Sequence, residues 1–286
     1  MKALQPKFSR RTLAIAAALF GTVSLAIGAH AALSLRALDA AKAVGNEEGS
    51  QSPKKVSRVA LIIGNGQYPD AAEPLTQPIN DARALSGELR RDGFDVEMIE
   101  DATKDDMTRA VDRLRGKIRS DSVVLLFFGG YGVQAGRESY MIPVDATIWK
   151  ESDVRRGGVS IEAVLDVMKE QGARAKLVVV DASRRNPYER RFRSFSHGLA
   201  PIAAPDNALI LSSSTPGKVV DDKLGEHSVL VAELLKNLAA GGLGADAVFN
   251  KTRLAISRAS EGEQVPSVSS SLLEDIHFAA ADSAGG

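Results

Sequence analysis

Two apolar runs limit what this chain of 286 residues can fold into more than any other feature. The segments SVVLLFF (122–128) and KLVVVD (176–181) are apolar almost throughout. A strand that is buried on both faces has this pattern, which is typical of the centre of a parallel sheet. We therefore expect both runs to be central strands of an α/β fold.

The segments around these runs alternate between strand and helix patterns. Further strands are expected at RVALIIG (58–64), FDVEMI (94–99) and ALILSSS (208–214), the second of them half-buried. Asn80, Thr103 and Ser160 can each cap a helix. The apolar stripes of these helices are Ala82, Leu85 and Leu89; Met107, Val111, Leu114 and Ile118; and Ile161, Val164, Leu165 and Met168. Two later helices are expected at 228–238 and 245–259. This order predicts a three-layer α/β sandwich with a mainly parallel central sheet.

A glycine-rich turn follows the first of the two apolar runs. The stretch LLFFGGYGVQ (125–134) indicates a strand that leads into an exposed turn, on which Tyr131 stands between Gly130 and Gly132. Ligands of parallel sheets bind at the carboxyl ends of the strands. The turn carries no strong acid, base or nucleophile, and this absence bears directly on function.

The N-terminus has the composition of an export segment. In residues 1–31, a basic stretch that includes Arg10 and Arg11 precedes an apolar run, and Ala-His-Ala fits a cleavage site. SRRTL resembles a twin-arginine signal. The alternative is an uncleaved anchor, because residues 13–33 approach the length that spans a bilayer. Both interpretations predict a periplasmic or otherwise exported protein, and the second anchors it in the inner membrane.

The remaining boundaries follow from composition. Residues 32–55 are expected to be a linker, 56–280 the folded domain and 281–286 a flexible tail. The chain has no cysteine, which excludes a disulfide and a cysteine nucleophile. Its 36 basic and 36 acidic residues give no charge excess that favours nucleic acid. No metal spacing, phosphate loop or complete dinucleotide motif is present, so no metal or cofactor is expected.

Several segments, in order and spacing, resemble the caspase-like domains of metacaspases and orthocaspases. They are ALIIGNGQY, PINDARAL, GFDVEMIEDATKDDM, SYMIPVDA, VVVDASRRNP and GLAPIAAPDNALILSSSTPGKVVDD, which together extend from about Val56 to about Leu238. The resemblance implies a caspase-like fold and a cysteine peptidase ancestry.

The family uses a histidine in a Ser-Gly-His-Gly turn and a cysteine in an Asp-x-Cys turn. The matching positions here are Tyr131 and Ser183, which are 52 residues apart, as the family's spacing of about 50 requires. A serine hydroxyl is a weak nucleophile without a base, and a phenol that titrates near 10 is a poor base at neutral pH. The resemblance therefore implies a pseudoprotease. The alternative is an active peptidase in which Ser183 attacks with help from a base outside the family pattern.

Two acidic residues match the family positions that bind a substrate arginine or lysine. They are Asp81 in PINDARAL and Asp181, two residues before Ser183. The resemblance implies that the cleft binds a basic peptide or protein segment, or that the domain regulates an active caspase-like relative. A weaker alternative is a purely structural envelope protein, in which the two aspartates serve only the fold.

A basic segment follows Ser183 directly. SRRNPYERRFRSFSHG contains Arg184, Arg185, Arg190, Arg191 and Arg193. Runs of charge are usually solvated, and this interpretation is the simplest. The segment could instead attract an acidic partner or fold back into the acidic cleft.

Overall fold

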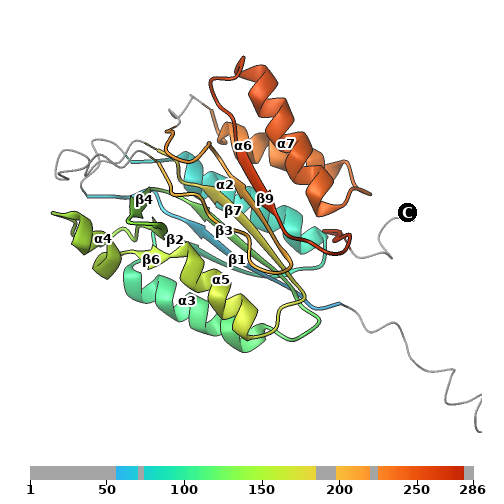
Figure 1. The fold of residues 1–286 in the computed structure, drawn as a ribbon, viewed down its shortest axis with the longest axis horizontal. Coiled ribbons are helices and arrows are strands. Elements are labelled where there is room, and N and C mark those ends of the chain that lie inside the picture. The colour runs from blue at the N-terminus through green and yellow to red at the C-terminus, as the bar shows by residue number, and fades with distance from the viewer. Residues whose placement is uncertain (1–55, 70–73, 185–197, 220–224, 280–286) are drawn as a thin grey trace, which may run out of the picture. The chain divides into compact units, whose positions relative to one another are not determined.

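The computed structural model describes residues 56–69, 74–184, 198–219 and 225–279. The expected export segment, linker and tail at 1–31, 32–55 and 281–286 lie outside these ranges. The described residues form the three-layer α/β sandwich that the sequence predicts, with a mainly parallel sheet between helices (Figure 1).

The central sheet has six strands in the order β2-β1-β3-β7-β8-β9. Its strands are β1 (Arg58–Gly64), β2 (Asp95–Glu100), β3 (Val123–Gly129), β7 (Ala175–Asp181), β8 (Ala208–Ser212) and β9 (Ser267–Ser270). All neighbours are parallel except β8 and β9, which are antiparallel. The two apolar runs at 122–128 and 176–181 form β3 and β7, and both strands are buried along their whole length.

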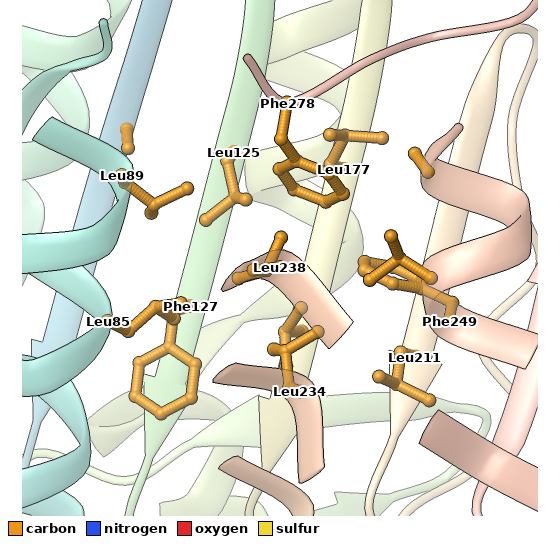
Figure 2. Close-up of a cluster of buried hydrophobic side chains, with 14 of the residues drawn as sticks. Leu85, Leu89, Leu125, Phe127, Leu177, Leu211, Leu234, Leu238, Phe249 and Phe278 are labelled. Carbon is orange, nitrogen blue, oxygen red and sulfur yellow. The ribbon is translucent and has the colours of Figure 1, made fainter. Parts of the chain in front are cut away.

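Helices cover both faces of this sheet. Helices α2 (Gln77–Arg91), α6 (Val229–Ala239) and α7 (Ala245–Ala259) pack on one face, and α3 (Lys104–Lys117) and α5 (Ile161–Glu170) pack on the other. Successive side chains of a strand point to opposite faces, so each strand feeds both cores. Figure 2 shows the first core, in which Phe127 and Leu177 from the sheet meet Leu85 and Leu234 from the helices.

The expected apolar stripes of α2, α3 and α5 all face the core, but one of the three expected caps is wrong. Helix α2 begins at Gln77 after Thr76, and Pro78 lies in its first turn. Proline is favoured there because its fixed φ suits the helix. Asn80 therefore lies inside the helix, and its side-chain amide donates to the backbone oxygen of Glu226 at 3.2 Å.

A second, smaller sheet was not predicted. It consists of β4 (Gly132–Ala135), β5 (Glu138–Met141) and β6 (Val159–Ser160), all antiparallel, with α4 (Glu151–Gly157) beside it. Its side chains form a third apolar cluster that includes Tyr68 and Tyr131. This cluster fixes the turn that follows β3.

The cap of α3 gives a test of the predicted local structure. The Thr103 hydroxyl accepts from the backbone N–H of Asp106 at 3.2 Å, and the Asp106 carboxylate accepts from the backbone N–H of Thr103 at 3.1 Å. We expect Thr103→Ala to lower the free energy of unfolding by about 1 kcal/mol, because the backbone N–H of Asp106 loses its acceptor and the reciprocal cap is broken. Urea unfolding measures this, with the exposed mid-helix change Thr108→Ala as the control. An equal loss in both variants would contradict the capping role.

Candidate active site

The two turns that carry Tyr131 and Ser183 lie side by side. Strands β3 and β7 pair in parallel up to Gly129 opposite Asp181. The pairing continues past the strands, because Gly130 N donates to the Asp181 carbonyl at 3.3 Å and Gly132 N donates to the Ala182 carbonyl at 3.0 Å. The structure therefore brings together the two positions that the sequence places 52 residues apart.

The Tyr131 turn is buried, so the expectation of an exposed turn is wrong. Tyr131 is 8% exposed, and its ring packs edge-on against Tyr68 with 4.7 Å between the centroids. The Tyr68 hydroxyl accepts from Tyr131 N at 3.1 Å and donates to the carbonyl of Ile142 at 2.9 Å. The physical reason is the small sheet, whose apolar side chains close over the turn and take up the ring.

Glycine is required on both sides of Tyr131. A Cβ on Gly132 would lie 2.8 Å from the Cβ of Ala182 and 2.6 Å from a methyl carbon of Leu199. A Cβ on Gly130 would lie 2.5 Å from the Tyr68 hydroxyl oxygen. Gly132 thus permits the close approach of the two turns, and Gly130 leaves room for the Tyr68 hydroxyl.

Ser183 is buried as well, at 2% exposure. Its backbone N–H donates to the hydroxyl oxygen of Ser213 at 3.4 Å. Within the described ranges, no hydrogen bond links the Ser183 hydroxyl to a histidine or to Tyr131. A serine acts as a nucleophile when a base removes its proton, and no such base is bonded to Ser183 among the described residues.

Asp81 lies in the first turns of α2 and is completely buried. Its carboxylate accepts from His227 Nδ1 at 2.9 Å and from the backbone N–H of Ser228 at 3.2 Å. Burial and the negative charge of Asp181 raise the pKa of Asp81 to about 6, although the hydrogen bonds from Ser228 and His227 oppose the rise. The two candidate binding carboxylates are therefore close enough to repel each other.

Asp181 ends β7 and is 6% exposed. Its Oδ2 is buried and receives no hydrogen bond. The nearest described cation is Arg184, whose Nη2 lies 3.7 Å from that oxygen, which is an ion pair but too long for a hydrogen bond. One buried carboxylate oxygen is thus left without a donor, which is costly in a folded protein.

Arg184 joins the two turns. It is 4% exposed, and its Nη1 donates to the carbonyl of Gly130 at 3.1 Å and to the carbonyl of Asp181. This part of the basic segment folds inward, beside the acidic pair. The other four arginines, Arg185, Arg190, Arg191 and Arg193, lie outside the described residues.

Sequence reasoning missed the roles of His227 and Tyr68. His227 matches no family position and lies just before Ser228, the N-cap of α6. Its contact with Asp81 joins residues that are 146 positions apart in the chain, and no local sequence pattern predicts this contact. Tyr68 stood inside the matching segment ALIIGNGQY, which was a usable signal that this side chain belongs to the site.

A family model described as the caspase domain matches residues 57–277. The chain belongs to the caspase domain family. The mucosa-associated lymphoid tissue lymphoma translocation protein 1 homolog of Mus musculus is 30% identical over 145 residues, and the Homo sapiens protein is 29% identical over 144 residues. Each match covers 50% of this chain and 17% of the relative, so the chain spans about a sixth of the length of these curated proteins.

This caspase domain therefore carries a set of mostly buried polar groups at the carboxyl ends of its strands. Two buried carboxylates, a partly exposed histidine and a buried arginine lie beside a buried serine. The set can bind a cation, because Asp81 and Asp181 offer acceptors in a poorly hydrated site. In the part that the structure describes, the buried Ser183 hydroxyl has no base bonded to it.

The described residues of this caspase domain contain no group of three or more histidine, cysteine, aspartate or glutamate side chains that could hold a metal ion. They also contain no helix that is long and apolar enough to cross a membrane. The N-terminal apolar run lies outside these residues.

Proposed function

We propose that this caspase domain is a catalytically inactive binding module that holds a basic side chain of a peptide or protein segment between Asp81 and Asp181. The observation that carries the proposal is the buried Oδ2 of Asp181, which has no hydrogen-bond donor. A guanidinium group would supply that donor and would offset the repulsion between the two carboxylates. An active caspase-like relative with an exposed arginine or lysine would be one protein that this site could bind.

His227 makes the site accessible in this proposal. Its side chain is 25% exposed, whereas the Asp81 side chain to which it bonds is fully buried. It is therefore the contact of Asp81 that an incoming guanidinium can replace most readily. The contact from the Ser228 backbone stays in place during such an exchange.

The arrangement of the two turns supports inactivity. The Ser183 hydroxyl is buried, and the ring of Tyr131, at the position of the family's histidine, packs against Tyr68. An imidazole there would act as a base, because its pKa lies near neutrality. The phenol ring serves packing instead.

One contact favours a second candidate function, a peptidase that uses Ser183. Asp81 holds Nδ1 of His227, which is the way a buried carboxylate orients a histidine base. In this alternative the other ring nitrogen of His227 would accept the proton of Ser183 after a local rearrangement. The two candidates differ in whether Ser183→Ala changes turnover.

Binding is tested with a fluorescent peptide that contains one arginine and with its matched citrulline peptide, which is neutral and similar in shape. We expect the full-length protein to bind the arginine peptide at least about tenfold more tightly, since a charge-assisted pair contributes about 1.5–3 kcal/mol. Asp181→Asn should abolish the preference. The exposed change Asp112→Asn on α3 is the control. Equal binding of the two peptides would overturn the proposal.

Turnover is tested with arginine-ended fluorogenic peptides. We expect no hydrolysis by the natural protein or by Ser183→Ala, and hydrolysis by the double variant Tyr131→His/Ser183→Cys, because the paired turns retain the spacing of the two positions. If the natural protein hydrolyses the peptides and Ser183→Ala does not, the second candidate function is established instead.

A further inference from the structure

A pocket of about 410 Å³ lies at the opposite end of the sheet from the candidate site. It opens at the amino ends of β1, β3 and β7, on the face that α2, α6 and α7 cover. Its apolar wall includes Leu238, Val248 and Phe278, and Figure 2 shows Leu238 and Phe278 among the side chains of the first core. None of the residues proposed above lines it.

Arg58 is an unexpected residue in this pocket. It is the first residue of β1 and shares a face with Ala60 and Ile62, which are both in the apolar core. Its Nη2 donates to the carbonyl of Ala279 at 3.3 Å, whereas its Nε is buried and has no hydrogen-bond partner. Burial also lowers the pKa of Arg58. A buried guanidinium N–H without an acceptor is costly, so a ligand that supplies one would be stabilised here.

Asp92 gives the pocket a negative charge, opposite in sign to that of Arg58. It follows the last residue of α2 and is half-buried, and burial raises its pKa. Among the described residues its carboxylate accepts no hydrogen bond and forms no ion pair, although the charges of Arg58 and Arg91 partly offset the rise in its pKa. Arg58 and Asp92 thus both line the pocket without direct contact.

The other charged side chains of the pocket already have partners. Arg174 pairs with Glu274 at 2.5 Å, and Asp275 contacts His277 at 3.2 Å. The pocket therefore presents one available cation, one available anion and an apolar wall.

We propose that this pocket binds a free α-amino acid with an apolar side chain. The ligand carboxylate accepts from Arg58, its ammonium group donates to Asp92, and its side chain packs against Leu238, Val248 and Phe278. A ligand with only a negative charge would be repelled by Asp92, and a ligand with only a positive charge would be repelled by Arg58. A zwitterion satisfies both groups, and the volume accommodates a side chain as large as that of leucine.

Isothermal titration calorimetry of the full-length protein tests the proposal with three ligands of one shape. Leucine carries both charges, 4-methylpentanoate lacks the ammonium group, and 3-methylbutylamine lacks the carboxylate. We expect leucine to bind and each half to bind at least about tenfold more weakly, because each loses one charge-assisted contact. Absence of leucine binding, or equal binding of either half, would overturn the proposal.

Variants assign the two contacts. Arg58→Met and Asp92→Asn should each weaken leucine binding at least about tenfold. The matched changes Arg109→Met and Asp112→Asn, both exposed on α3, should leave it unaltered. Circular dichroism melting confirms folding, and Arg58→Gln, which keeps a polar side chain but loses the charge, replaces Arg58→Met if that variant is unfolded. Undiminished leucine binding by a folded Arg58 variant contradicts the assignment.

Discussion

Arg184→Met is expected to lower the free energy of unfolding by about 3–5 kcal/mol, which is the usual cost of removing one partner of a buried ion pair. The loss has two sources. The Asp181 carboxylate, already without a hydrogen-bond donor at Oδ2, would lose its nearby cation. The carbonyls of Gly130 and Asp181 would lose the guanidinium that joins the two turns. Chemical denaturation at neutral pH measures the change.

A matched surface arginine provides the control. Arg113 pairs with Glu97 at 2.6 Å, but its side chain is 51% exposed. Arg113→Met should therefore cost less than about 1 kcal/mol, as exposed ion pairs generally do. If Arg184→Met cost no more than Arg113→Met, Arg184 would not be part of the buried structure that holds the two turns together.

Asp81→Asn is expected to raise stability at pH 8 while it abolishes the preference for an arginine peptide. The pKa of Asp81 is raised from 3.8 to about 6, so the ionised form is disfavoured in the folded protein. A difference of this size corresponds to about 3 kcal/mol of destabilisation above pH 6. Asparagine avoids this cost, and its amide oxygen can still accept from His227 and Ser228.

The sign of the pH dependence follows from the raised pKa of Asp81. Below about pH 4 the group is protonated in both the folded and unfolded states, so the natural protein suffers no penalty from it. Between about pH 4 and pH 6 the folded state binds the extra proton, and the stability contributed by Asp81 falls as the pH rises. The stability gain of Asp81→Asn should therefore be small at pH 4 and reach about 1–3 kcal/mol at pH 8.

Urea unfolding of both proteins at the two pH values measures this difference. The exposed change Asp112→Asn should alter stability by less than about 0.5 kcal/mol at either pH. A variant that is less stable than the natural protein at pH 8 would show that Asp81 contributes to folding through its charge. The two aspartates would then have a structural role, as in the envelope-protein alternative.

Much of the fold was predictable because hydrophobic periodicity is a local property of the sequence. The continuous apolar runs identified β3 and β7, and Thr103 and Ser160 cap their helices as expected. The small sheet was missed because its strands are two to four residues long, which is too short for a periodic signal.

The candidate site was predictable only in part, for a related reason. The register of β3 and β7 brings the turns of Tyr131 and Ser183 together, and two parallel strands with the right spacing suffice to predict that. The burial of Tyr131 depends on Tyr68 and on the small sheet, and the environment of Asp81 depends on His227. These contacts join segments distant in the chain, so only the tertiary structure reveals them.

Helix α2 has a mechanical consequence that follows from its two ends. Asp81 lies near its beginning and Asp92 directly follows its end, at opposite ends of the sheet. The fifteen residues of the helix form a rod of about 22 Å, with an apolar stripe held against the sheet and α6. Because the hydrogen-bonded helix is stiff, a displacement of its Asp92 end along the helix axis would move Asp81 by a similar distance.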